Sequence, residues 1–124
     1  MDLYREEILD HYKHPHNFGR LANANATGEE HNVSCGDKII MEVLIGTSAK
    51  AKKIVDVRFS GIGCAISMAS ASMLTDRVMG MSVENVMKLT LTDIQDALGT
   101  ILMPARVKCA MLSLEVLQKT VNKK

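Results

Sequence analysis

Residues 38–72 decide the fold, and they read KIIMEVLIGTSAKAKKIVDVRFSGIGCAISMASAS. In residues 38–45 every second side chain is apolar, and residues 54–60 repeat this period of two, which is typical of half-buried β-strands. Because only a short turn separates the two strands, we expect them to pair as an antiparallel hairpin. The side chains expected to face the core are Ile39, Met41, Val43 and Ile45 in the first strand, and Val55, Val57 and Phe59 in the second.

The same stretch ends by opening a helix. Gly61-Ile62-Gly63-Cys64 precedes a segment of mostly small side chains that is helical to about Met79, and Gly80 suits the position after the helix end. Because strands come before most of the helices, we expect an α+β fold. We expect one domain over residues 1–124, in which a small antiparallel sheet of about three strands packs against helices.

Capping signals place the remaining elements. Ser82 can cap a short helix, Thr92 and Gln95 form a capping box for another that ends at Gly99, and Pro104 opens the last helix. An N-terminal helix ends before Pro15, and residues 27–32 are expected to form an edge strand.

The composition excludes several classes of protein. Of 124 residues, 15 are Lys or Arg and 14 are Asp or Glu, so the formal net charge is only +1. We expect no nucleic-acid or membrane partner, because such binding needs clustered positive charge. No apolar run approaches the ~18 residues of a membrane span, and the first residues lack the basic-then-apolar order of a secretory signal. We therefore expect a cytoplasmic location.

Three cysteines carry the clearest chemical signal. An odd number cannot all pair within the chain and no CxxC is present, so we exclude a disulfide framework, a zinc ribbon and a thioredoxin-like site. Cys35 and Asp37 precede the first strand, and a period of two places both on its apolar face. A carboxylate there needs a cation, hydrogen bonds or a metal ion. The alternative is that Asp37 caps a turn in water.

The other two cysteines lie at the starts of helices. Cys64 follows two glycines at a helix N-terminus, where exposed N–H groups and the helix dipole favour a thiolate. Cys109 follows Arg106 and Lys108, and these two cations also favour a thiolate. Taken singly, each cysteine could instead be an inert core residue.

The histidines form a rival cluster. His11, His14 and His16 are spaced by three and two residues, and His31 follows further on. They straddle a helix end and Pro15, and no second cluster completes a tetrahedral zinc set. A favourable interaction with the helix C-terminus accounts for them, so we expect no zinc site among them.

Together, these segments resemble the motifs of the IscU/SufU/NifU-N family. The matching segments, in the family's order, are residues 4–19, Ser34-Cys35-Gly36-Asp37, residues 61–67 and Arg106-Val107-Lys108-Cys109-Ala110. The resemblance covers essentially the whole chain. It implies an α+β, SufE/NifU-like domain with a small antiparallel sheet and flanking helices.

The resemblance also implies a site made of Cys35, Asp37, Cys64 and Cys109. Family members receive persulfide sulfur from a pyridoxal-phosphate cysteine desulfurase. Many assemble a 2Fe–2S cluster on this site, and several bind zinc there. Three thiolates and one carboxylate suit zinc, iron or one face of a cluster.

We therefore expect a scaffold and carrier, not an enzyme, that accepts sulfur, binds iron, a transient 2Fe–2S cluster or zinc, and supplies apo iron–sulfur recipient proteins. Cys64 or Cys109 would take the sulfur, with Arg106 and Lys108 in support, while Cys35 and Asp37 hold the metal. Two alternatives stay open. One is a zinc-dependent sulfurtransferase partner of the desulfurase that carries no cluster, and the other is a structural zinc module.

The chain departs from the family's branches at three points. Lys108 stands where the IscU branch has His, and residues 102–106 lack that branch's Leu-Pro-Pro-Val-Lys motif, so we expect no Hsp70-type chaperone as partner. The chain resembles the SufU branch more, yet the segment between Cys64 and Cys109 is too short for that branch's insertion.

Overall fold

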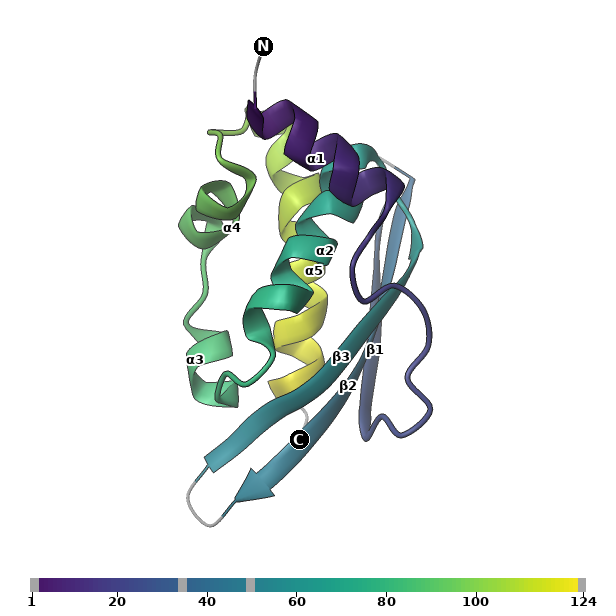
Figure 1. Cartoon of the computed structure of the whole chain (residues 1–124), viewed down its shortest axis with the longest axis vertical. Coiled ribbons are helices and arrows are strands. Elements are labelled where there is room, and N and C mark those ends of the chain that lie inside the picture. Colours follow the sequence, from purple (N-terminus) through teal and green to yellow (C-terminus); the bar gives the residue numbers. More distant parts are fainter. Residues whose placement is uncertain (1–2, 34–35, 49–50, 123–124) are drawn as a thin grey trace.

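The computed structural model describes residues 3–33, 36–48 and 51–122. Three strands and five helices are found in these residues (Figure 1). Their bounds are α1 (Leu3–Lys13), β1 (Ala26–Asn32), β2 (Asp37–Ser48), β3 (Ala51–Ile62), α2 (Ala65–Val78), α3 (Val83–Met87), α4 (Leu91–Leu98) and α5 (Pro104–Asn122). The expected edge strand and Pro104 as the start of the last helix are both confirmed.

The strands form one antiparallel sheet in the order β1-β2-β3, which confirms the predicted α+β class. The helices gather on one side of this sheet (Figure 1). Among them, α5 contacts β1 and β2, α2 contacts β3 and α5, and α1 lies against α2. The sheet and the α2–α5 pair therefore enclose the core.

The alternation of β2 predicts its buried face correctly. Ile39, Met41, Val43 and Ile45 are all buried. They meet apolar side chains of α2 and α5 in one continuous cluster, and this apolar burial is the main stabilising contribution to such a fold.

In β3 the prediction for Val55 is wrong, because the strand contains a β-bulge. The pairing changes register between Leu44, which opposes Asp56, and Ile45, which opposes Ile54. Val55 is therefore an extra residue with 56% of its surface exposed, whereas Ile54 is fully buried. A bulge places two residues of one strand against one of its partner and so reverses the alternation.

Capping interactions fix the helix ends. The Ser82 hydroxyl accepts the Asn85 N–H at the start of α3, and Gly80 follows α2 with a φ of 86°, both as predicted. The predicted cap of α4 at Thr92 is wrong. The helix begins two residues earlier, where the Asp93 carboxylate accepts the backbone N–H of Thr90 at 2.9 Å.

The segment between α1 and β1 first pairs with the free edge of β3 and then crosses the face of the sheet opposite the helices. Backbone hydrogen bonds join Asn17 and Gly19 to Phe59 of β3. Further on, the carboxylate of Glu42, which is nearly buried, accepts Nε of Arg20. This segment therefore contacts the face of the sheet that the helices leave uncovered.

No described helix is both long enough and apolar enough to span a membrane.

Candidate metal centre

One carboxylate and two thiols converge where α2 and α5 begin. Ligand atoms of Asp37, Cys64 and Cys109 all lie within 4.8 Å of one another. No other group of three or more His, Cys, Asp or Glu side chains this close is found in residues 3–33, 36–48 and 51–122. Ligands of one tetrahedral zinc ion are separated by about 3.5–3.8 Å. The donors fit such an ion after moving by only about 1 Å.

Asp37 lies on the apolar face of β2, as its register with Ile39 predicts. It is only 2% exposed, so the alternative of a turn cap in water is wrong. Its Oδ1 accepts the backbone N–H of Cys64 at 2.9 Å, and its Oδ2 lies 4.0 Å from the Cys64 Sγ. One oxygen is thus held by the backbone, and the other faces the thiols.

Cys64 is the N-cap residue of α2, as predicted. Gly63 makes its position possible, because a Cβ there would lie 2.1 Å from Ser67 Oγ and 3.2 Å from Asp37 Oδ1. Gly61 has a φ of 128°, and a Cβ on it would lie 1.9 Å from the carbonyl oxygen of Lys38. The two glycines let β3 end against β2 and deliver Cys64 beside Asp37.

The three cysteines differ in their burial and in whether the structure describes them. Cys109 is fully buried near the start of α5, whereas Cys64 is partly exposed. Cys35 lies outside the described residues, so its part in the site stays a prediction from the alternation and from the family resemblance.

Arg106 and Lys108 lie on the exposed side of the first turns of α5. Lys108 lines a surface cavity of about 250 Å³ together with His31, Val33 and Glu115. Within the described part of the chain neither cationic side chain makes an ion pair. Both are therefore presented to solvent beside the turn that carries Cys109.

Sequence reasoning missed two features near the cysteines and histidines. Ser67 donates its hydroxyl to the carbonyl oxygen of Cys64 at 3.1 Å, so both backbone polar groups of Cys64 are engaged. Its place three residues after Cys64 was a usable signal, since residues i and i+3 of a helix share a face. The rings of His11 and His16 also meet, with centroids 4.5 Å apart, while His14 does not join them.

The model of the NifU-like N terminal domain family matches residues 3–123. The chain belongs to this family. It is 36% identical to the zinc-dependent sulfurtransferase SufU of Bacillus subtilis, covering 98% of this chain and 90% of that protein. It is also 36% identical to the iron–sulfur cluster assembly scaffold protein IscU of Aquifex aeolicus, covering 96% of this chain and 74% of that protein.

Solved structures give the same family fold. A protein described as a SufU scaffold of the SUF system from Fervidobacterium islandicum superposes with a TM-score of 0.75 at 30% identity, covering 94% of each chain. The alignment with the Bacillus SufU spans 138 positions, more than the 124 residues of this chain, so that relative has residues without a counterpart here. The family thus includes proteins named as scaffolds and a protein named as a sulfurtransferase, and Asp37, Cys64 and Cys109 form a candidate metal site in this chain.

Proposed function

We propose that this protein is a scaffold and sulfur acceptor in iron–sulfur cluster assembly. The observation that carries the proposal is the convergence of Asp37, Cys64 and Cys109 within 4.8 Å. Two thiolates and a carboxylate are ligands that zinc and iron accept. The names of the relatives in the family support the same reading.

Cys35 would complete a four-ligand site. Strand alternation places it on the same face as Asp37, two residues away. A zinc ion, or iron brought for cluster assembly, would supply Lewis-acid stabilisation of the thiolates. Because the carboxylate is a harder ligand than a thiolate, its bond to iron would be the most exchangeable one, which suits a protein that passes its cargo on.

Sulfur would arrive as a persulfide on a cysteine desulfurase. A thiolate of Cys64 or Cys109 attacks the outer sulfur of that persulfide, and the enzyme's S–S bond breaks as the new one forms. The electron pair leaves on the enzyme's cysteine, so the sulfane sulfur moves with no net oxidation. Partly exposed Cys64 is reachable directly, whereas fully buried Cys109 requires local opening. The exposed Arg106 and Lys108 support steering of an anionic persulfide.

The surface beside the cysteines supports a protein partner. Among the residues whose burial the structure describes, the four most exposed large apolar side chains all lie close in sequence to the candidate metal-binding residues. They are Val33, Ile62, Ile101 and Met103, with between 74% and 91% of their surface exposed. Exposed apolar groups next to cations are typical of a protein-binding surface. We assign this surface to the desulfurase and, after assembly, to apo recipient proteins in the cytoplasm.

A second candidate function is sulfur transfer with a permanently bound zinc ion and no cluster. The similarity to the Bacillus SufU, which is named a zinc-dependent sulfurtransferase, favours it.

The test is anaerobic reconstitution with iron and sulfide, followed by transfer to an apo-ferredoxin. A visible-range cluster spectrum that moves to the ferredoxin supports the scaffold. Stimulation of a cysteine desulfurase by the zinc form, without any reconstituted cluster, supports the second candidate. Neither a cluster nor stimulation would reject both functions and leave a structural zinc module.

A further inference from the structure

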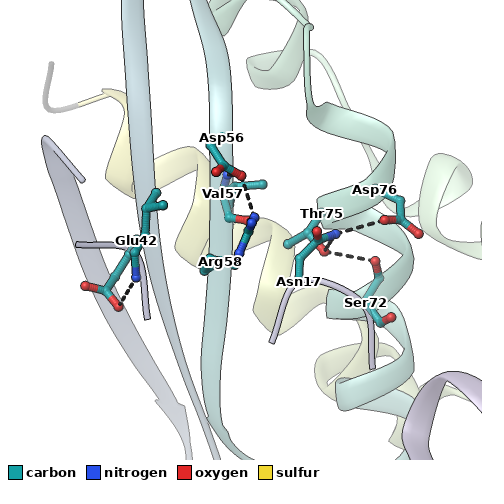
Figure 2. A network of polar contacts seen from close by, with 9 residues as sticks. Asn17, Glu42, Asp56, Val57, Arg58, Ser72, Thr75 and Asp76 are labelled. Atoms are coloured by element: carbon teal, nitrogen blue, oxygen red, sulfur yellow. Dashed lines mark hydrogen bonds and ion pairs between the residues drawn. The ribbon is translucent and has the colours of Figure 1, made fainter. Parts of the chain in front are cut away.

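Two histidines outside the thiol cluster are paired by the fold. The ring centroids of His11 and His16 lie 4.5 Å apart at an interplanar angle of 49°. The turn at Pro15 brings them together, and Asn17 fixes that turn in the left-handed region with a φ of 59°. Asn17 also donates to Asp76 Oδ1 at 2.8 Å and to the Thr75 hydroxyl at 3.0 Å (Figure 2).

Both rings turn Nδ1 toward α2. His16 Nδ1 lies 2.5 Å from Asp76 Oδ2, and His11 Nδ1 lies 2.7 Å from the Ser72 hydroxyl. The in-plane bonding directions of the two imidazole nitrogens diverge widely, so with Nδ1 bonded to α2 the Nε2 of each histidine is directed away from its partner on α2. The His16 side chain is 50% exposed, so the ring is within reach of an ion from solvent.

The hydrogen bonds also fix which ring nitrogen is engaged. A carboxylate only accepts, so His16 donates from Nδ1 to Asp76 Oδ2 and Nε2 is the ring nitrogen left for a metal ion. A hydroxyl oxygen has two lone pairs, so Ser72 can accept both the backbone N–H of His16, at 2.8 Å, and Nδ1–H of His11. Carboxylate–histidine pairing of this kind orients metal-binding histidines and raises their basicity.

We propose that His11 and His16 form a second metal site, which binds one divalent late transition ion such as Cu²⁺ or Ni²⁺. Both ligand atoms are Nε2, and water fills the other positions. Two imidazoles bound at about 2.1 Å to one ion place their centroids about 4.5–5 Å apart, which agrees with the observed separation. Imidazole nitrogens suit this class of ion. The bound ion would link α1, which carries His11, to the segment that follows Pro15.

The site is tested without its thiol competitor, by changing all three cysteines to Ser and titrating with Cu²⁺ or Ni²⁺ in a calorimeter. We expect one ion per chain. His11→Gln and His16→Gln should each weaken binding at least tenfold, and Asp76→Asn should weaken it severalfold because it removes the carboxylate partner. The matched controls His14→Gln and His31→Gln should leave affinity unchanged. If the His11→Gln and His16→Gln variants bind as tightly as the parent protein, or if a control variant loses as much affinity as they do, the proposal is overturned.

If the triple variant does not fold, wild-type protein with zinc already bound serves instead. Substoichiometric Ni²⁺, which is paramagnetic, should then broaden the ring proton NMR signals of His11 and His16 before those of His14 and His31. Uniform broadening of all four overturns the proposal. Because neither readout uses the cysteines, failure here is distinguishable from failure of the proposed function.

Discussion

Oδ1 of Asp37 accepts the backbone N–H of Cys64 at 2.9 Å. Asp37 in β2 therefore holds the N-cap residue of α2, the helix that follows β3. The bond joins the end of β3 to the start of β2 and leaves Oδ2 facing the thiols. Structural anchoring and metal binding are thereby assigned to two different atoms of one side chain, and substitutions can separate them.

The first prediction compares Asp37→Asn with Asp37→Ala. Neither variant retains the charge, yet the Asn oxygen still accepts the Cys64 N–H, whereas Ala leaves that buried donor unpaired. Without metal, we expect the Ala variant to be less stable than the Asn variant by about 1–3 kcal/mol in denaturant unfolding. Zinc should raise the Tm of wild type strongly and of both variants weakly. Equal stability of the two variants would show that Oδ1 anchors nothing.

The second prediction concerns the contact between Gly63 and Ser67. An alanine at position 63 would place its Cβ 2.1 Å from Ser67 Oγ. We expect Gly63→Ala to destabilise the protein by about 1–3 kcal/mol through overpacking. Adding Ser67→Ala should recover part of that loss, because it removes the clashing oxygen. A double-mutant cycle of unfolding free energies measures the coupling, and strict additivity would contradict the packing described.

The third prediction follows from the β-bulge. Ile54 is fully buried and Val55 is largely exposed, although strict alternation predicts that Val55 faces the core. Ile54→Ala should cost about 2–5 kcal/mol of unfolding free energy. The neighbouring change Val55→Ala should fall within about 0.5 kcal/mol of wild type. A larger cost for Val55 than for Ile54 would mean that the strand has the regular register.

The fourth prediction concerns acid stability. The Thr90 N–H and then the nearby Arg77 hold the pKa of Asp93 below its ordinary value of 3.8. A lowered folded pKa means that the carboxylate stabilises the fold above pH 3.8 and loses this contribution as the pH falls through the folded value. The stability gap between wild type and Asp93→Asn should therefore close on acidification in that window. A gap that stays constant through the same pH window would contradict this cause.

Local patterns predicted much of this fold. The buried face of β2, the start of α2 at Cys64 and the start of α5 at Pro104 all follow from periodicity and capping preferences. The errors arose where a single residue shifts the alternation of a strand or the start of a helix. Val55 is inserted by a bulge, and the helix expected from Thr92 is capped at Thr90, because Asp93 at the third helical position reaches back to it.

The candidate site was only partly predictable for a different reason. Asp37 and Cys64 are 27 residues apart and Cys109 is 45 further on, so only tertiary packing joins them. Sequence placed each residue on its element, and the family resemblance alone joined them into one site. The pairing of His11 with His16 depends on the turn at Pro15 and on hydrogen bonds to α2. The spacing of the histidines along the sequence gives no information about either.

The most direct test of the central claim is the amount of tightly held zinc per chain in purified protein after dialysis. The convergence of Asp37, Cys64 and Cys109 predicts about one zinc for wild type and for His14→Gln. Cys35→Ser, Cys64→Ser and Cys109→Ser should each lose most of it while remaining folded by circular dichroism. Full zinc content in the folded Cys64 and Cys109 variants, with loss in His14→Gln, would contradict the site.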